Sequence, residues 1–458
     1  MEGWAGEELK EAKLGDKRLN RRLVKLVEAL AEQPSESVPQ ACGSWAATQA
    51  AYRFWDNDEV KVEAIRQAHV QGTEKRLEGE KRVLVVQDTT ELDWSQHRHT
   101  TGLGSLAAAS HRGLHVHSAL AVSEAGVPLG LVHQQVWQRD PASTGQAATR
   151  RSRETQDKES QRWLSTQAAS LKAVPEAVAV VTVADREADI YDLFAAKRRA
   201  GADLLVQAAQ NRLVDDETRY LFSAIAARPI AGWVRVEVGR RADQEPRAAL
   251  LSVRFTRLDL LPPRHHRQRS TLRPIRVQVI LVEEDHPPEG CTALKWLLLT
   301  TLPIETLEPA LECVRWYASR WLIERYHFVL KSGCGLEQLQ LQTADRLQRA
   351  LATYSLVAWR LLWLTYLARR SPDLPCTLVL ETHEWQALLA TVHRTPTPPD
   401  SSPSLAQAVR WIAQLGGFLA RKGDGDPGVK TLWRGLARLH DIAATWRLAH
   451  SSPPTPPP

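Results

Sequence analysis

Two short runs of apolar, mostly β-branched residues constrain the fold of this chain more than any other feature. They are VLVV at residues 83–86 and VAVV at residues 178–181, and each leads to an aspartate, Asp88 or Asp185. Continuous apolar runs of this length are typical of strands buried on both faces. An aspartate at the end of such a strand adds nothing to the core, and α/β proteins usually place their active sites at strand ends. The sequence therefore predicts an α/β layer with a functional edge.

The remaining patterns extend this layer and divide the chain. Residues 114–122 and 127–137 read as two strands joined by a turn, and a helix is expected around Trp163. Several β-like runs between about residues 213 and 302 predict an all-β insertion, and helical patterns resume from about 305 to 370. At roughly 150 residues per domain, the 458 residues suggest about three domains. We expect a core at 76–375, a helical domain at 1–75, and a helical segment at 376–458 ending in a disordered proline-rich tail.

A basic amphipathic helix is predicted near the N-terminus. Asp16 is a suitable N-cap, and leucines recur after it at helical spacing. The other faces of this helix carry cations, namely Lys17, Arg18, Arg21, Arg22 and Lys25. Solvation and contact with DNA explain such a helix equally well, so this pattern leaves both open. A second basic segment, at residues 140–160, is expected to be a loop.

Charge and cysteine content exclude several classes of protein. Lysine and arginine number 59 against 53 aspartates and glutamates, and a net charge of +6 permits a polyanionic partner without requiring one. The five cysteines form no CxxC pair, so they indicate neither a disulfide framework nor a zinc site. No stretch approaches the ~18 apolar residues of a membrane span, and the first residues do not resemble a signal peptide. We expect a soluble, cytoplasmic protein without a membrane partner.

The segment from Tyr317 to Lys331 is the most informative part of the chain about function. In one continuous helix at ~100° per residue, Tyr317, Arg320, Glu324 and Lys331 would share a stripe about 60° wide. Cations and a hydroxyl on this stripe suit phosphate oxygens, and the carboxylate suits a metal among them. A salt-bridged surface helix is the alternative for this segment taken alone.

Three carboxylates taken together favour a functional interpretation over a salt-bridged surface helix. Asp88, Asp185 and Glu324 form a set of hard oxygen ligands suited to Mg²⁺. Two such ions, ~3.5–4 Å apart, can activate a water and stabilise the leaving 3′ oxygen of a phosphodiester. A single aspartate at a strand end is more often a turn or cap residue, but three carboxylates beside a cationic helix favour catalysis. We therefore predict that these three residues are catalytic and hold the metal.

Longer motifs surround these residues. They are VVQDTTELDW around Asp88, ADREADIYDLF around Asp185, the Y-(2)-R-(3)-E-(6)-K signature from Tyr317 to Lys331, KESQRW, LKWLLLTT and DPGVKTLWRGLARLHDIA. LGDKRLNRRL and PQACGSWAATQAAYRFWDN stand near the N-terminus. Through them the chain resembles, over nearly its whole length, the bacterial DDE transposases of the IS-four group, which contains the Tn-five transposase.

The resemblance implies an RNase H-like catalytic core with an all-β insertion before the glutamate helix. It implies that Asp88, Asp185 and Glu324 coordinate catalytic Mg²⁺, with Mn²⁺ able to substitute, and that Tyr317, Arg320 and Lys331 bind phosphates near the cleavage site. Trp296 matches the position at which relatives stack a base flipped out of the transposon end. A buried strand aromatic is the other interpretation of Trp296.

The function implied is cut-and-paste DNA transposition. The protein would bind inverted-repeat ends through residues 1–75 and pair two ends in a homodimer, using its C-terminal segment as a dimerisation domain. It would nick the DNA to free a 3′-OH and join the ends to target DNA in the bacterial nucleoid.

Some residues depart from the pattern or stay ambiguous. Gln207 stands where relatives are expected to have an arginine, which leaves Arg212 as the DNA-binding candidate in that segment. His115 and His117 share a strand face, but no cysteine or carboxylate completes a zinc set, so we interpret them as ordinary strand residues. One of three acids near Asp185 is expected to contact the metal ligands without binding the metal itself. These acids are Glu187, Asp189 and Asp192.

Two alternatives remain. A catalytically silent relative would occupy DNA ends as an inhibitor or regulator, and the intact acidic residues argue against it. An RNase H-like nuclease without strand transfer would leave the N- and C-terminal segments unexplained.

Overall fold

The computed structural model describes residues 3–108, 110–139, 159–238, 247–266 and 269–450. The predicted basic loop at 140–160 and the proline-rich tail lie almost wholly outside these residues. The strands are β1 (Arg82–Asp93), β2 (Gly104–Ser105), β3 (Arg112–Ser123), β4 (Pro128–Trp137), β5 (Ala179–Ala184), β6 (Ala202–Gln207), β7 (Gly232–Val238), β8 (Arg247–Leu260), β9 (Ile275–Glu283) and β10 (Lys295–Thr300).

These strands form one continuous sheet in the order β2-β3-β1-β5-β6-β10-β9-β8-β7, with β4 paired to β3. β1, β5 and β6 are parallel neighbours, while β3 and β4 add antiparallel strands at one side. The run at 83–86 is buried on both faces as predicted. Leu84 and Val86 pack in the cluster that contains Ile323 of the later helices, whereas Val83 and Val85 pack beside Val174. This mixed α/β arrangement is consistent with an RNase H-like core.

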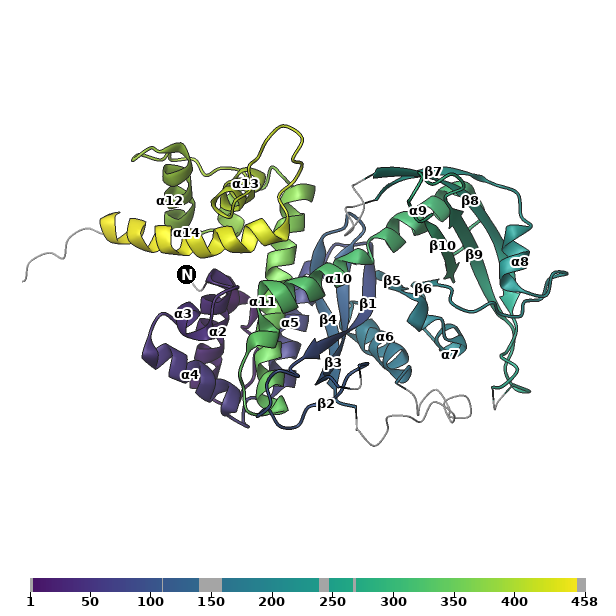
Figure 1. Ribbon diagram of the computed structural model, residues 1–458, viewed down its shortest axis with the longest axis horizontal. Helices are drawn as coiled ribbons and strands as arrows, with labels where there is room; N and C mark the ends of the chain where they lie inside the picture. The colour runs from purple at the N-terminus through teal and green to yellow at the C-terminus, as the bar shows by residue number, and fades with distance from the viewer. Residues whose placement is uncertain (1–2, 109, 140–158, 239–246, 267–268, 451–458) are drawn as a thin grey trace, which may run out of the picture.

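The insertion continues the core sheet, because β10 pairs antiparallel with β6 and places Leu298 opposite Gln207. β7 to β10 then form an antiparallel meander on the right of Figure 1. The prediction of an all-β insertion misses one short helix, α8 (Leu221–Ala226), which packs on β8 and β9. Leu221 and Ile225 are fully buried and give this helix its apolar face.

The helices that follow the insertion are α9 (Leu307–Ala318), α10 (Trp321–Phe328) and α11 (Ala344–Arg370), and the core also contains α6 (Gln161–Ala173) and α7 (Tyr191–Ala195). The continuous helix expected from Tyr317 to Lys331 is wrong. The chain turns at Ser319–Arg320 between α9 and α10, and a π-turn, Val329–Gly333, follows α10. A π-turn inserts an extra residue, so Lys331 leaves the stripe that ideal helical spacing assigns to it.

The N-terminal helices are α1 (Trp4–Glu8), α2 (Lys17–Glu32), α3 (Val38–Cys42), α4 (Trp45–Asp56) and α5 (Val62–Leu77). Asp16 caps α2 as predicted, since its side chain accepts the N–H of Arg18 at 2.7 Å. These helices share one hydrophobic cluster with the sheet and with α11, to which Leu23, Leu30 and Trp55 contribute. The N-terminal region therefore has no separate core.

A buried ionic cluster fastens α1 to the rest of the molecule. Glu8 contacts Nδ1 of His69 at 2.5 Å and accepts hydrogen bonds from Arg76 at 2.6 and 2.9 Å. Nε2 of His69 accepts the backbone N–H of Leu131 on β4 at 2.9 Å. Arg360 of α11 lies over the ring of Trp4 at 4.2 Å.

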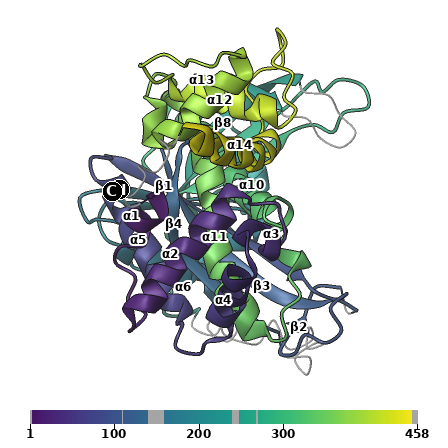
Figure 2. The same ribbon diagram turned by 90° about the vertical axis from the view of Figure 1, so that its left-hand side faces the viewer.

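The C-terminal helices are α12 (Thr382–His393), α13 (Leu405–Leu415) and α14 (Val429–His450). Figure 2 shows α14 lying over the N-terminal helices, and α14 contacts α2. α13 and α14 approach very closely at Gly435, where an added Cβ would stand 1.8 Å from the carbonyl oxygen of Ile412. No helix in the described ranges is both long enough and apolar enough to cross a bilayer.

Candidate active site

Asp88 and Asp185 lie side by side because β1 and β5 are parallel and in register. Gln87 pairs with Ala184, so Asp88 and Asp185 each come one residue after the last pair of this parallel ladder. Asp185 follows its strand as predicted, but the prediction that Asp88 ends its strand is wrong, because β1 continues to Asp93 by pairing with β3. The carboxylate of Asp88 accepts the N–H of Thr89 at 2.8 Å, and that of Asp185 accepts the N–H of Glu187 at 2.9 Å. The structure thus brings the two predicted aspartates together.

Burial raises the pKa values of both acids in this pair. Burial, and then the charge of Asp185, raise the pKa of Asp88 to about 7. Burial also raises the pKa of Asp185. Carboxylates whose charged forms are disfavoured in this way are stabilised by a cation among them.

Glu324 reaches the same edge from α10. Its Oε1 is 2.5 Å from Nη2 of Arg320, one helical turn earlier. Glu324 further raises the pKa of Asp88, whereas Arg320 lowers the pKa of both Asp88 and Asp185. The three predicted catalytic carboxylates and one of the predicted phosphate-binding cations therefore share one electrostatic neighbourhood.

These three acids fit a hard divalent cation by their chemistry, since Mg²⁺ prefers carboxylate oxygens. Within the described ranges, no group of three His, Cys, Asp or Glu side chains is drawn together as a ready metal site. Glu324 is paired with Arg320. That Asp88, Asp185 and Glu324 hold such an ion stays a prediction.

Tyr317 lies behind this edge at the end of α9. Its hydroxyl is 2.6 Å from the amide of Gln207, and its ring contacts that of Trp296 edge-on at 5.4 Å. Burial raises the pKa of Tyr317 to about 12, so the hydroxyl keeps its proton for donation. With the amide of Gln207 turned to satisfy both of its ends, the oxygen accepts from Arg186 at 3.2 Å. A guanidinium thus stands beside Gln207.

Lys331 and Arg212 are placed differently from the other candidates. Nζ of Lys331 donates to the carbonyl of Glu91 at 2.9 Å and lies 3.4 Å from Glu337. The guanidinium of Arg212 is bound to Asp189 at 2.6 and 2.8 Å. Asp189 therefore organises the segment after β6, and a DNA contact by Arg212 or Lys331 stays a prediction.

Two side chains near the aspartates were not predicted. Arg162 of α6 donates to Oγ1 of Thr89 at 3.0 Å and to Glu187 at 2.5 Å, and its charge lowers the pKa of Asp185. Nδ1 of His327, three residues after Glu324, is 4.0 Å from Asp88. Burial lowers the pKa of His327 to about 3, so the ring is neutral. The helical spacing from Glu324 was the available signal for His327.

The strand histidines are structural in their contacts. His117 lies 2.8 Å from Oγ1 of Thr89 and packs edge-on against Trp163 at 4.6 Å. His115 stacks on Trp137 at 5.2 Å. These contacts agree with ordinary strand residues.

A second candidate surface lies on the N-terminal helices. Lys17, Arg18 and Arg21 are exposed on α2, and Arg22 is half-buried. Within the helical region predicted at 1–75, α4 begins with Trp45, 76% exposed, and also exposes Tyr52. An exposed tryptophan beside basic residues is a common feature of surfaces that bind nucleic acid.

Family models match three consecutive parts of the chain. A transposase DNA-binding model matches residues 1–60, a transposase DDE domain model residues 92–360, and a transposase Tn5 dimerisation domain model residues 356–455. The DDE match alone covers more than half of the chain, so the chain belongs to the DDE transposase family. It is a DNA transposase of the Tn5-like kind, with DNA and a second copy of itself as partners.

Proposed function

We propose that this protein is a cut-and-paste transposase that binds inverted-repeat ends, cleaves them with Mg²⁺ and transfers the 3′-OH ends to target DNA. The observation that carries the proposal is the juxtaposition of Asp88 and Asp185, with Glu324 and Arg320 facing them from α10. Bound Mg²⁺, which Mn²⁺ can replace, supplies activation of the attacking oxygen and stabilisation of the leaving 3′ oxygen.

The protein's own side chains bind and position the DNA in this proposal. Arg320 attracts the scissile phosphate and balances the charge of the carboxylates. The protonated hydroxyl of Tyr317 donates to a phosphate oxygen. Trp296, half-buried against Tyr317, presents an aromatic surface for a displaced base. Lys331 exchanges its contact with Glu337 for a phosphate.

End recognition is assigned to the N-terminal helices. Lys17, Arg18, Arg21 and Arg22 on α2 supply charge for the phosphate backbone, and exposed Trp45 and Tyr52 on α4 supply contacts to the grooves. Arg212, bound to Asp189, positions the segment that leads from β6 into the insertion.

A paired binding and cleavage experiment tests the proposal. Glu324→Ala should shift labelled terminal-repeat DNA in a gel as the wild type does, yet neither cleave nor join it with Mg²⁺. Wild-type binding without cleavage would indicate the silent relative instead. Cleavage by Glu324→Ala would show that the catalytic assignment is wrong.

A further inference from the structure

The insertion sheet has a second face, opposite to the one that carries Trp296. Cross-strand register places Trp233, Ser252, Glu283 and Lys295 in one row across β7 to β10. Side chains alternate along each strand, so Trp296, next to Lys295, points to the other face and packs in the main core. The two faces therefore offer separate surfaces.

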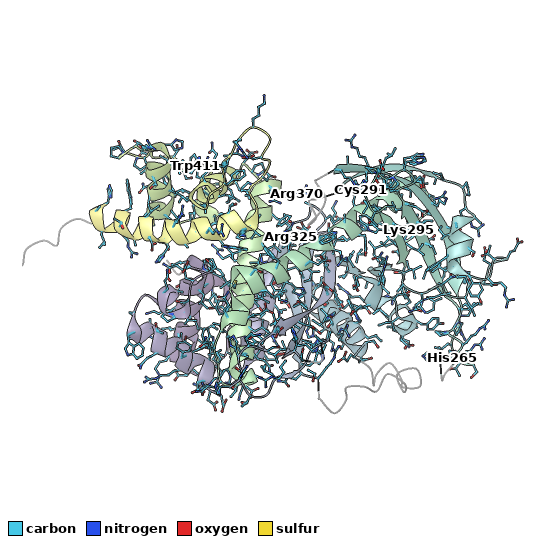
Figure 3. The ribbon with its side chains drawn as sticks, in the orientation of Figure 1. His265, Cys291, Lys295, Arg325, Arg370 and Trp411 are labelled. Carbon is cyan, nitrogen blue, oxygen red and sulfur yellow. The ribbon has the colours of Figure 1, made fainter. Side chains whose placement is uncertain are left out.

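A cavity of about 590 Å³ opens on this second face, between the sheet and α8. Figure 3 labels Lys295 on the insertion sheet, at the same end of the molecule as α8. The apolar lining includes Ile225, Leu281 and Leu297, and Phe222 of α8, 42% exposed, adds an aromatic ring. This volume lies in the range that small organic ligands fill.

The charged lining of the cavity is mainly cationic. Arg186, Arg254 and Lys295 contribute guanidinium and ammonium groups, and Glu283 is the one carboxylate among the lining residues. Nζ of Lys295 is 2.6 Å from Glu283, so these two charges largely cancel. Arg186 and Arg254 remain as two positive charges beside an apolar surface.

The cavity adjoins the catalytic edge. Arg186 directly follows Asp185, and Gln207, which also lines the cavity, contacts the hydroxyl of Tyr317 at 2.6 Å. On the side away from the catalytic edge, the same sheet face continues to the edge strand β7. Trp233 of β7 is 48% exposed, and Leu250 of the neighbouring strand β8 is 59% exposed.

We propose that this cavity binds an unpaired nucleotide of the DNA strand that passes Asp185. The base packs between Phe222 and Leu297, and Arg186 and Arg254 bind its phosphates. Trp233 stacks the adjoining base. Aromatic rings interleaved with cations are how proteins bind single strands with little sequence preference. The inference rests on the proposed DNA substrate but assigns a surface separate from Trp296.

The test compares binding of a 12-nucleotide single strand and the corresponding duplex by fluorescence anisotropy, without metal. The double variant Phe222→Ala/Arg254→Glu should bind the single strand about tenfold or more weakly while binding the duplex within about twofold of the wild type. Lys81→Glu, a charge reversal at an exposed residue just before β1, is the matched control and should change neither affinity.

Trp233→Ala provides a second variant on an exposed side chain, where misfolding is not expected. It should weaken single-strand binding severalfold, and removal of one base from the oligonucleotide should weaken the wild type but not the Phe222→Ala/Arg254→Glu variant. Unchanged single-strand binding in both variants, or an equal loss of duplex binding, would overturn the pocket. Cleavage is absent from this assay, so failure of the pocket and failure of the catalytic proposal are distinguishable.

Discussion

Nη2 of Arg320 lies 2.5 Å from Oε1 of Glu324, one turn further along α10. The same guanidinium lowers the pKa of Asp88 and of Asp185. Arg320 thus acts on all three acids at once. It keeps the aspartates closer to their charged, metal-binding form, and it holds Glu324 in place on the helix.

Removal of Arg320 should therefore weaken cleavage through the acids as well as through the DNA. We expect Arg320→Ala to cut end DNA roughly 10²-fold more slowly, because a preorganised charge is lost. The pH at which cleavage reaches half its maximum should move upward, because the pKa of Asp88 and Asp185 rises without Arg320. Arg315→Ala, which removes an exposed arginine of α9, is the control. An unchanged pH profile would contradict this role.

Asp88 should make the metal-free protein less stable as the pH rises. Its pKa is about 7 in the folded protein against 3.8 when unperturbed, so its ionisation opposes folding. This destabilisation is absent below about pH 4, grows between pH 4 and 7, and is complete above pH 7. Asp88→Asn should therefore be more stable than the wild type at pH 8, by on the order of a few kcal/mol in the free energy of unfolding, and should melt at a higher temperature. At pH 4 the two proteins should melt at nearly the same temperature.

The melting curves of Asp88→Asn should be measured by calorimetry in the presence of EDTA. Asp373→Asn, at an exposed aspartate, should follow the wild type at every pH. A variant less stable than the wild type at pH 8 would show that the crowding of Asp88 is misjudged.

Mg²⁺ should raise the melting temperature of the wild type at pH 7.5, since an ion that binds only the folded state stabilises it by RT ln(1 + [L]/Kd). The shift should vanish in Asp185→Asn, and Mn²⁺ should reproduce it. Because the pKa of Asp88 is about 7, binding should also release protons, which calorimetry in buffers of different ionisation enthalpy detects. Equal shifts in the wild type and Asp185→Asn would place the ion elsewhere.

The cluster at Glu8 should contribute strongly to stability. Burial alone would raise the pKa of Glu8, but His69 and Arg76 lower it to about 2 from 4.5. The resulting stabilisation is complete above about pH 4.5 and is lost as the pH falls toward 2. At pH 7, Glu8→Gln should lower the free energy of unfolding by about 3–5 kcal/mol, because Arg76 stays partly buried without its counter-charge.

Urea denaturation of Glu8→Gln should be compared with that of Glu7→Gln, which changes the exposed neighbouring residue of α1. The Glu7 variant should unfold with the wild type. Equal effects of the two substitutions would mean that the buried pair contributes little.

The sequence predicted that Asp88 and Asp185 lie close together, because a buried apolar run that leads to an aspartate is a local signal. It predicted β3 and β4 nearly to their ends and the start of β1 and β5, but it ended β1 at Asp88, whereas the strand continues to Asp93. It failed where the outcome depends on neighbours distant in the chain. The sequence pattern is helical without interruption from α9 to Lys331. It therefore gives no sign of the break between α9 and α10 or of the π-turn at Lys331. The partner of Arg212 is Asp189, 23 residues away, and no spacing rule foretells that pair.

The sequence also did not predict residues whose contacts depend on a helix packing against the sheet. Arg162 stands in a segment that marks the family, yet its contact with Thr89 needs α6 and β1 brought together. The cationic cavity beside the insertion is lined by residues of four strands, β6, β8, β9 and β10, together with α8. Residues that follow a buried strand along the chain can thus be recognised from sequence. Residues that gather on one face of a sheet can be recognised only when the register of neighbouring strands is known.

The cluster that the N-terminal helices share with the sheet and with α11 has a mechanical consequence. A DNA-binding unit on a flexible tether can read a sequence at variable distance from the cut. Here α4 packs in the same hydrophobic cluster as β1 and β5, so the packing sets the distance between the exposed face of α4 and the carboxylates of Asp88 and Asp185. In the proposed function this distance sets the position of the cut relative to the recognised bases, and an insertion of one base pair between them should displace the cut.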